Sequence, residues 1–157
     1  MALAVVRTSI AAVVAAVLAS TLVAVPLAPA AHASEAGDYA RQAFKVTNNK
    51  RDKHDLADLR RMRCLQKAAR RHAKDMAEAE MIWHQDIGQV MRDCGLDRVG
   101  ENVAAGYPTG RAVVRAWMRS PGHRRNILND EFERMGLAAR KGDDGRWYAA
   151  QVFGRKA

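Results

Sequence analysis

The stretch Ser120-Pro121-Gly122-His123-Arg124-Arg125-Asn126-Ile127-Leu128 opens with a residue pair that commonly starts a helix. Serine suits the N-cap position, and proline suits the first helical position, where no N–H donor is required. The stretch therefore predicts a short helix that runs through Leu128. It places His123, an imidazole able to bind a metal ion or a proton, near the start of that helix.

Three further helices are predicted upstream of this stretch. The nearest, Arg111–Arg119, has Thr109 or Gly110 as its cap. The others are Arg61–Glu80 and Glu35–Arg51, and the polar segment Asn48–Asp58 is predicted as a loop between them. Each helix has an apolar face at helical spacing. In Arg111–Arg119 the inward-facing residues are expected to be Val113, Val114 and Trp117. In Arg61–Glu80 they are Leu65, Ala69, His72 or Ala73 and Met76, and in Glu35–Arg51 they are Tyr39, Ala43 and Val46.

Downstream of the stretch the apolar pattern changes to short runs. Met135–Arg140 and Trp147–Phe153 are separated by a polar segment that contains Asp144-Gly145, a typical hairpin signal. We predict an antiparallel pair of strands here. Because the helices come first and the strands last, the order favours an α+β fold over a parallel α/β fold.

The chain has 157 residues, which corresponds to one domain. Residues 8–25 are almost wholly apolar, follow the single positive charge of Arg7, and precede the small-residue step Ala31-His32-Ala33. This pattern predicts a signal peptide, residues 1–33, that is cleaved after Ala33 to release a secreted domain of residues 34–157. An uncleaved membrane anchor is the alternative, because the apolar run is nearly long enough to span a bilayer.

The two cysteines, Cys64 and Cys94, rule out a disulfide-dense mini-scaffold and a four-cysteine zinc ribbon. In an oxidising compartment they are expected to pair. The closed loop of about 30 residues then contributes roughly 3.5 kcal/mol in the chain-entropy model. A catalytic thiol is the alternative, but no Cys–His couple lies nearby in the sequence.

Basic residues are concentrated in one window. The whole chain has 26 Lys+Arg against 17 Asp+Glu, a net charge of +9, and the window 45–74 holds eleven of these basic residues against three Asp. Such a window is either a solvated helix surface or a patch for an anionic extracellular partner, such as anionic lipid or wall polymer. Nucleic acid is not expected as a partner, because neither a nucleic-acid-binding motif nor an aromatic residue accompanies these charges.

Three residues on separate segments form a candidate metal site: His84, Glu101 and His123. Imidazole and carboxylate groups suit zinc and similar divalent ions. Their wide spacing gives no HxxxH or HExxH helix face, so spacing alone favours hydrogen-bonded structural histidines. His72 lies on the apolar stripe of its helix and is expected to be a buried structural histidine.

Several motifs follow one another in a fixed order. They are Asn48-x-x-Arg51, Leu56-x-x-Leu59, His84, Gly100-Glu101-Asn102, Trp117, the stretch Ser120–Leu128, Gly136 and Gln151-x-Phe153. Together they resemble the CAP superfamily, which is named after the cysteine-rich secretory, antigen 5 and pathogenesis-related 1 proteins and whose domain is also called SCP. The resemblance covers residues 39–153 and is to the compact bacterial secreted form.

The resemblance implies an α-β-α sandwich with a central antiparallel sheet. It also implies a cleft lined by two histidines and, in many members, two acidic residues. Carried over by motif, His84 and His123 are the histidine pair, which can hold one divalent ion, expected to be zinc. Glu101 is the first acid and the candidate catalytic residue. The place of the second acid, counted from Trp117, holds Ser120, so this chain departs from the four-residue set.

The remaining motif residues have structural interpretations. Asn102 is expected to bond the backbone of a tight turn, Arg124 to pair with an acid inside the fold, and Asn126 to tie its loop to the hairpin. Ser120 fits an N-cap better than a hydrolase nucleophile. Two acids that follow the stretch, Asp130 and Glu131, are predicted to be ordinary loop residues rather than substitutes for the absent acid. Trp117, Tyr148 and Phe153 are predicted to lie in the core.

Three functions are compatible with these residues. The first is a secreted, monomeric binding module with a metal-capable histidine cleft and a ligand that the sequence does not identify. The second is a metal-dependent hydrolase of extracellular peptide or wall material, which needs an activated water and a base. The third is a lipid- or sterol-binding protein assisted by the basic helices. The first is preferred because it does not require the second acid.

Overall fold

The computed structural model describes residues 28–157, with side chains from Ser34 onward. Most of the predicted signal peptide lies outside the described residues, so its cleavage after Ala33 stays a prediction. Within residues 28–157, no helix combines the length and the apolar character needed to cross a bilayer.

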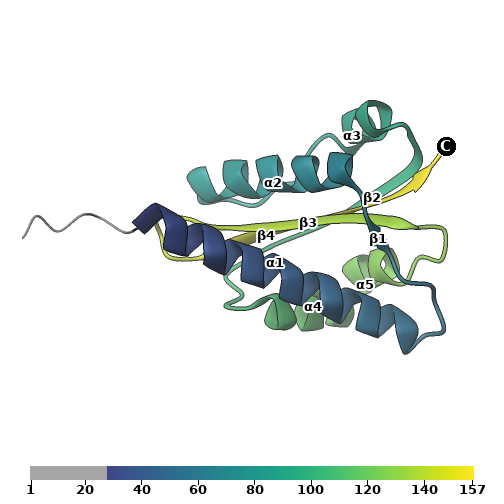
Figure 1. Cartoon of the computed structure of the whole chain (residues 1–157), viewed down its shortest axis with the longest axis horizontal. Helices are drawn as coiled ribbons and strands as arrows, with labels where there is room; N and C mark the ends of the chain where they lie inside the picture. Colours follow the sequence, from purple (N-terminus) through teal and green to yellow (C-terminus); the bar gives the residue numbers. More distant parts are fainter. Residues whose placement is uncertain (1–27) are drawn as a thin grey trace, which may run out of the picture.

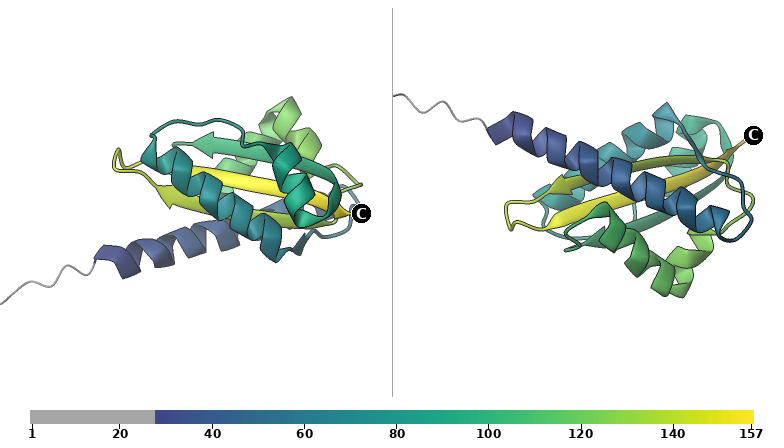
Figure 2. Two further views of the ribbon diagram at one scale, coloured as in Figure 1. Left: turned by 90° about the horizontal axis from the view of Figure 1, so that it is seen from above. Right: turned by 60° about the horizontal axis from the view of Figure 1, so that its bottom comes forward.

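The described chain forms three layers, with a sheet between two groups of helices (Figure 1). One face of the sheet carries α1 (Ala28–Asp52), α4 (Gly110–Arg119) and α5 (Pro121–Ile127), and the other carries α2 (Arg63–Glu78) and α3 (Ile87–Cys94), as the rotated views in Figure 2 also show. The strands are β1 (Arg60–Arg61), β2 (Leu96–Ala105), β3 (Arg134–Lys141) and β4 (Trp147–Lys156). The predicted α+β sandwich is therefore confirmed.

The sheet has the strand order β1-β3-β4-β2. β4 pairs antiparallel with both β2 and β3, which confirms the predicted hairpin and the antiparallel centre. The short strand β1 adds a parallel pair, in which Arg60 and Arg61 lie opposite Arg134 and Met135. The sheet is thus mixed, and β1 covers only the first two residues of β3.

Each face of the sheet carries its own apolar cluster. The predicted stripe of α2 is buried against one face, where Leu65, Ala69 and Met76 are fully covered. α1, α4 and α5 cover the other face, around Trp117 and Phe153. Trp117, Tyr148 and Phe153 are all buried, as predicted. Burial of these faces removes apolar surface from water, and each Å² contributes about 25 cal/mol of stabilising free energy. This hydrophobic burial is the main force that holds the layers together.

Two boundaries differ from the sequence prediction. The predicted helix Glu35–Arg51 and the predicted loop Asn48–Asp58 overlapped, and the structure assigns residues 48–52 to the helix, α1. Their side chains are tied down, because Asn48 exchanges two hydrogen bonds with the backbone of Leu59 and Arg51 is buried. Arg61 belongs to β1 rather than to the helix that follows it.

Three elements, β1, α3 and β2, were not predicted. α3 is short, but Ile87, Val90, Met91 and Cys94 recur at helical spacing, so its sequence carried a signal that the prediction did not use. β2 has five consecutive buried residues from Gly100 to Ala104, and two of them, Glu101 and Asn102, are polar. Such a run lacks the alternation that marks a half-exposed strand.

The predicted helix starts are confirmed in position. Thr109 rather than Gly110 caps α4, because its hydroxyl accepts a hydrogen bond from the N–H of Ala112 at 3.1 Å. Ser120 occupies the extended N-cap position before Pro121, but its hydroxyl makes no capping hydrogen bond. The proline, with its fixed φ, therefore carries the local start signal of α5.

The predicted disulfide is present. Cys64 in the first turn of α2 and Cys94 at the end of α3 are bonded, with their Cα atoms 5.6 Å apart. The bond fastens α3 to the larger helix. It holds the segment between them, which contains His84, in a closed loop of the chain.

Candidate functional site

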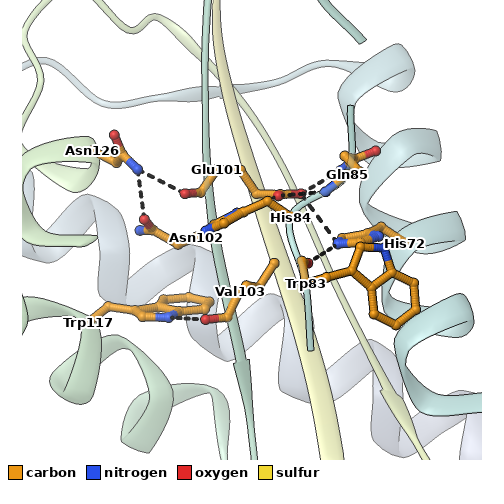
Figure 3. Close-up of polar contacts among 9 residues, drawn as sticks. All are labelled: His72, Trp83, His84, Gln85, Glu101, Asn102, Val103, Trp117 and Asn126. Atoms are coloured by element: carbon orange, nitrogen blue, oxygen red, sulfur yellow. Dashed lines mark hydrogen bonds and ion pairs between the residues drawn. The ribbon is translucent and has the colours of Figure 1, made fainter. Parts of the chain in front are cut away.

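Glu101 on β2 is the centre of a buried polar cluster (Figure 3). Its side chain is 1% exposed. Oε2 accepts hydrogen bonds from Nδ1 of His84 at 2.8 Å and from the backbone N–H of Gln85 at 3.2 Å. Oε1 accepts from Nε2 of Gln85 at 2.6 Å, and Nε2 of His72 lies 3.9 Å away. Both carboxylate oxygens are therefore engaged within the protein.

This contact fixes the tautomer of His84. An ionised carboxylate can only accept, so Nδ1 of His84 must carry the proton. Nε2 then has a free lone pair when the ring is neutral. The His84 side chain is 61% exposed, and a ligand can therefore reach its ring.

His123, in the first turn of α5, faces the same region. Its ring lies 6.5 Å from the Trp117 ring, centroid to centroid. Burial lowers the pKa of His123 below its ordinary value, and the charge of nearby His84 lowers it further. The ring is therefore neutral near pH 7, the form that binds metal ions.

A network of amides joins β2 to α5. Nδ2 of Asn102 donates to the carbonyl of His123 at 3.2 Å and to Oε1 of Gln151 at 3.0 Å. Nδ2 of Asn126 donates to the carbonyl of Glu101 and to Oδ1 of Asn102, each at 2.9 Å. Together these bonds hold the His123 segment against the strand that carries Glu101. The amides therefore position the two halves of the site.

Three sequence interpretations of motif residues are wrong. Asn102 lies in a strand and not in a tight turn. Asn126 ties its helix to β2 and not to the β3–β4 hairpin. Arg124 is exposed, and among residues 34–157 it has no ion pair with an acid. The amides were misassigned because their partners are distant in sequence and come together only when α5 packs against β2 and β2 pairs with β4.

Neither loop acid supplies the absent carboxylate. Glu131 pairs with Arg98 at 2.9 Å and with Arg155 at 3.4 Å. Asp130 is exposed and lines a hollow beside α5. Both were predicted to be ordinary loop acids, and their positions agree with that.

Sequence reasoning did not find Gln85 as a site residue. It makes two of the hydrogen bonds that hold Glu101, and its own Oε1 is buried with no hydrogen-bond partner among the described residues. Its only sequence signal is its place directly after His84. His72 was correctly predicted as buried; its Nε2 bonds the carbonyl of Trp83 at 2.7 Å.

The arrangement bears on the metal set of His84, His123 and Glu101. Among residues 28–157, no three His, Cys, Asp or Glu side chains are grouped so as to hold an ion. Both oxygens of Glu101 accept hydrogen bonds from His84 and Gln85, so the carboxylate has no unengaged oxygen to offer an ion. The two imidazoles are the donors that remain available.

An apolar segment borders the site. Met81, Ile82 and Trp83 precede His84 directly and are 59%, 48% and 37% exposed. They are the large hydrophobic side chains that the described structure leaves most exposed. His84 therefore lies between an exposed apolar segment, which we call the apolar rim, and the buried polar cluster around Glu101.

A three-layer sandwich whose edge strand carries a buried carboxylate, with one histidine bonded to that carboxylate and another on a neighbouring helix, defines a CAP-type domain. Residues 44–153 match the cysteine-rich secretory protein family, CAP, which accounts for more than half of the chain. The chain belongs to this family, as the motif resemblance predicted.

Three bacterial proteins are among those that the chain resembles. The chain is 35% identical over 111 residues to the uncharacterized protein YkwD of Bacillus subtilis, a match that covers 66% of this chain and 43% of YkwD. A solved extracellular SCP-domain protein of Bacillus anthracis is 30% identical, with a TM-score of 0.74, and the match covers 83% of this chain and 45% of that one. An outer surface protein of Borrelia burgdorferi, at 24% identity and a TM-score of 0.67, shares the fold over 74% of this chain and 92% of its own. The chain thus spans less than half the length of the two Bacillus relatives.

Proposed function

We propose that the protein is an exported binding module whose cleft holds one divalent ion, zinc in the first instance, on His84 and His123. The observation that carries this proposal is the 2.8 Å contact between Nδ1 of His84 and the buried Glu101 carboxylate. A carboxylate that fixes one ring nitrogen orients the other toward a metal and raises its basicity, an arrangement common among metal-binding histidines.

The donors fit an ion with two protein ligands. The lowered pKa of His123 keeps its ring neutral near pH 7, as a ligand must be. Two ligands are fewer than the three of typical catalytic zinc sites. The other coordination positions are then left to water or to a donor on the bound molecule, such as a carboxylate, phosphate or carbonyl oxygen. Such an ion would recognise a ligand by coordinating one of these oxygen donors.

Binding is favoured over hydrolysis by the use already made of Glu101. A general base needs a free acceptor oxygen within reach of the attacking water. Both oxygens of Glu101 accept hydrogen bonds from His84 and Gln85. The position of the second family acid holds Ser120. The hydrolase is therefore the weaker proposal for this chain.

The exposed apolar rim favours a lipid or sterol as a second candidate ligand. Met81, Ile82 and Trp83 offer apolar contact directly beside His84. A molecule with one polar group and an apolar body would match both parts of the site. Export is supported by the signal pattern of residues 1–33 and by the Bacillus anthracis relative, which is described as extracellular.

The test is zinc titration by calorimetry on the purified protein. We expect one ion per chain, loss of binding in His84→Ala/His123→Ala, and unchanged binding in the control His54→Ala, which alters an exposed turn residue. Glu101→Gln should weaken the affinity by about 10–100-fold, the usual effect of losing an orienting partner. If wild type does not bind zinc, or if the double variant binds it equally well, the metal proposal is wrong.

A further inference from the structure

The outer edge of β3 is only partly covered. Within the described chain, β1 is its sole outer neighbour and pairs with Arg134 and Met135 alone. Leu137 shows which way the edge faces, because its N–H donates to Oε1 of Gln66 at 3.4 Å and its C=O accepts from Nε2 of Gln66 at 2.8 Å. Backbone groups alternate along a strand, so the N–H and C=O of Ala139 point to the same open side.

This edge lies in a groove between α1 and α2, which run on opposite faces of β3 (Figure 1). The groove has a volume of about 1130 Å³. Its floor is built from small side chains, including Ala36, Ala40, Ala138 and Ala139. Small residues leave room beside the strand for another backbone.

The rim of the groove is strongly basic. Of the described residues that line it none is acidic, and the basic ones come from α1, β1, α2 and β3. Besides Lys74, they are Arg41, Arg61, Arg63, Lys67, Arg70 and Arg140. Asp38 and Glu78 lie outside the groove and pair with Arg41 and Lys74 across exposed surface. Exposed pairs of this kind contribute little, so the groove keeps a large positive potential.

The basic side chains are close enough to repel one another. The pKa of Arg61 is lowered, first by burial and then by the charges of Arg41 and Arg70. These three residues come from α1, β1 and α2, so the fold itself gathers them. An anionic partner would relieve this repulsion. Arg51, which lies in the same basic window of the sequence, takes no part because it is buried elsewhere.

We propose that this groove binds an acidic peptide in an extended conformation, which adds to the open edge of β3 as a further strand. Its backbone pairs with Ala139, and its carboxylates meet the basic rim. A lipid tail or a polysaccharide could use the charge or the apolar floor, but neither offers N–H and C=O groups at strand spacing. The groove lies at the edge of the sheet opposite to β2, so the inference is independent of the histidine cleft.

The probe is a fluorescein-labelled hexapeptide of alternating glutamate and valine, followed by fluorescence anisotropy. Its partner probe has the same sequence with every peptide nitrogen methylated, which keeps the charge but removes the strand donors. We expect the first peptide to bind and the methylated one to bind at least tenfold more weakly. Hydrogen exchange of the Ala139 amide should slow at least tenfold with the peptide, while that of Ala138, which faces β4, stays protected throughout.

The protein variants separate the groove from net charge. Lys67→Glu/Arg70→Glu reverses two exposed charges of the rim, and we expect it to lose at least tenfold in peptide affinity. Arg111→Glu/Arg115→Glu reverses two exposed charges on α4 and is the matched control, expected to bind within about twofold of wild type. Both variants change the net charge equally.

Four results would overturn the inference. They are absence of peptide binding, equal binding of the methylated peptide, equal losses in both charge variants, and an unchanged Ala139 exchange rate. Vesicles that contain phosphatidylglycerol serve as the comparison. Binding of these vesicles without binding of the peptide would assign the basic surface to membranes and would equally reject the strand proposal.

Discussion

Replacing Arg51 by methionine should destabilise this fold more than the loss of any other single charge. The Arg51 side chain is 1% exposed. Its guanidinium donates to the carbonyls of Ala57 at 2.8 Å, Ile127 at 2.9 Å, Asn129 at 2.7 Å and Phe132 at 3.3 Å. It thereby ties the end of α1 to the loop that follows it, to α5 and to the segment that leads into β3. Burial lowers its pKa, but a guanidinium stays charged at any ordinary pH.

The magnitude follows from the three shorter bonds. A hydrogen bond from a charged donor contributes about 1.5–3 kcal/mol, and methionine leaves three carbonyls without it. Methionine recovers part of this loss as apolar burial, so we expect Arg51→Met to lower the free energy of unfolding by about 4 kcal/mol. Arg51→Lys keeps the charge but not the fork of donors, and it should lose about half as much.

The assay is urea unfolding followed by tryptophan fluorescence and circular dichroism, with equal m-values required for the comparison. Arg115→Met, at an exposed position on α4, is the control and should stay within about 0.5 kcal/mol of wild type. A loss below about 1 kcal/mol in Arg51→Met would refute the reasoning, because the guanidinium would then not be the link between these segments.

Three further outcomes are expected. Cys64→Ser/Cys94→Ser should lower the free energy of unfolding by about 3.5 kcal/mol in the same assay. A loss below about 1 kcal/mol would show that the bond does not stabilise the fold by restricting the unfolded chain over this 30-residue separation. Gly136→Ala should cost more than about 3 kcal/mol, beyond ordinary overpacking, because its Cβ would lie 2.2 Å from the backbone carbon of Leu65; near-wild-type stability would disprove this close approach. The pKa of His123, measured by NMR titration, should lie below its ordinary value. Its contribution to stability is then complete above the ordinary pKa and is lost as the pH falls through the lowered one, so a midpoint at or above the ordinary value would contradict the site geometry.

The elements that sequence reasoning found are those whose own residues carry the signal. The stripe of α2 repeats at helical spacing because one face is buried against the sheet. The β3–β4 hairpin is marked by Asp144-Gly145, and Gly145 adopts a φ of +76°, which glycine reaches without strain. The cysteine pair was predictable from its count and compartment. In each case the residues themselves favour the conformation or the bond that the folded protein has.

The missed strand β2 depends on partners far away in the chain. β2 contains buried Glu101 and Asn102, which would be unfavourable if the hydrogen bonds from His84, Gln85 and Asn126 did not satisfy them. No pattern within the strand reveals those bonds. The same holds for Arg51, since charged side chains are almost never fully buried unless they are paired, and its four acceptors are backbone carbonyls that sequence does not distinguish.

The buried carboxylate of Glu101, which lies in the strand that the sequence did not predict, also bears on function. Where two acids are present, one can orient a histidine while the other accepts a proton or binds a ligand. This chain has Glu101 and, in the second place, Ser120. Because Glu101 is engaged in holding His84 and Gln85, removing its bonds to free it for catalysis would also release the histidine that the reaction needs. The two roles exclude each other on one side chain, and the buried, fully engaged carboxylate of Glu101 is the reason for which we propose the orienting role. For that reason we expect Glu101→Gln to act on zinc affinity, and a variant that kept zinc binding intact while it abolished a hydrolytic activity would reverse this assignment.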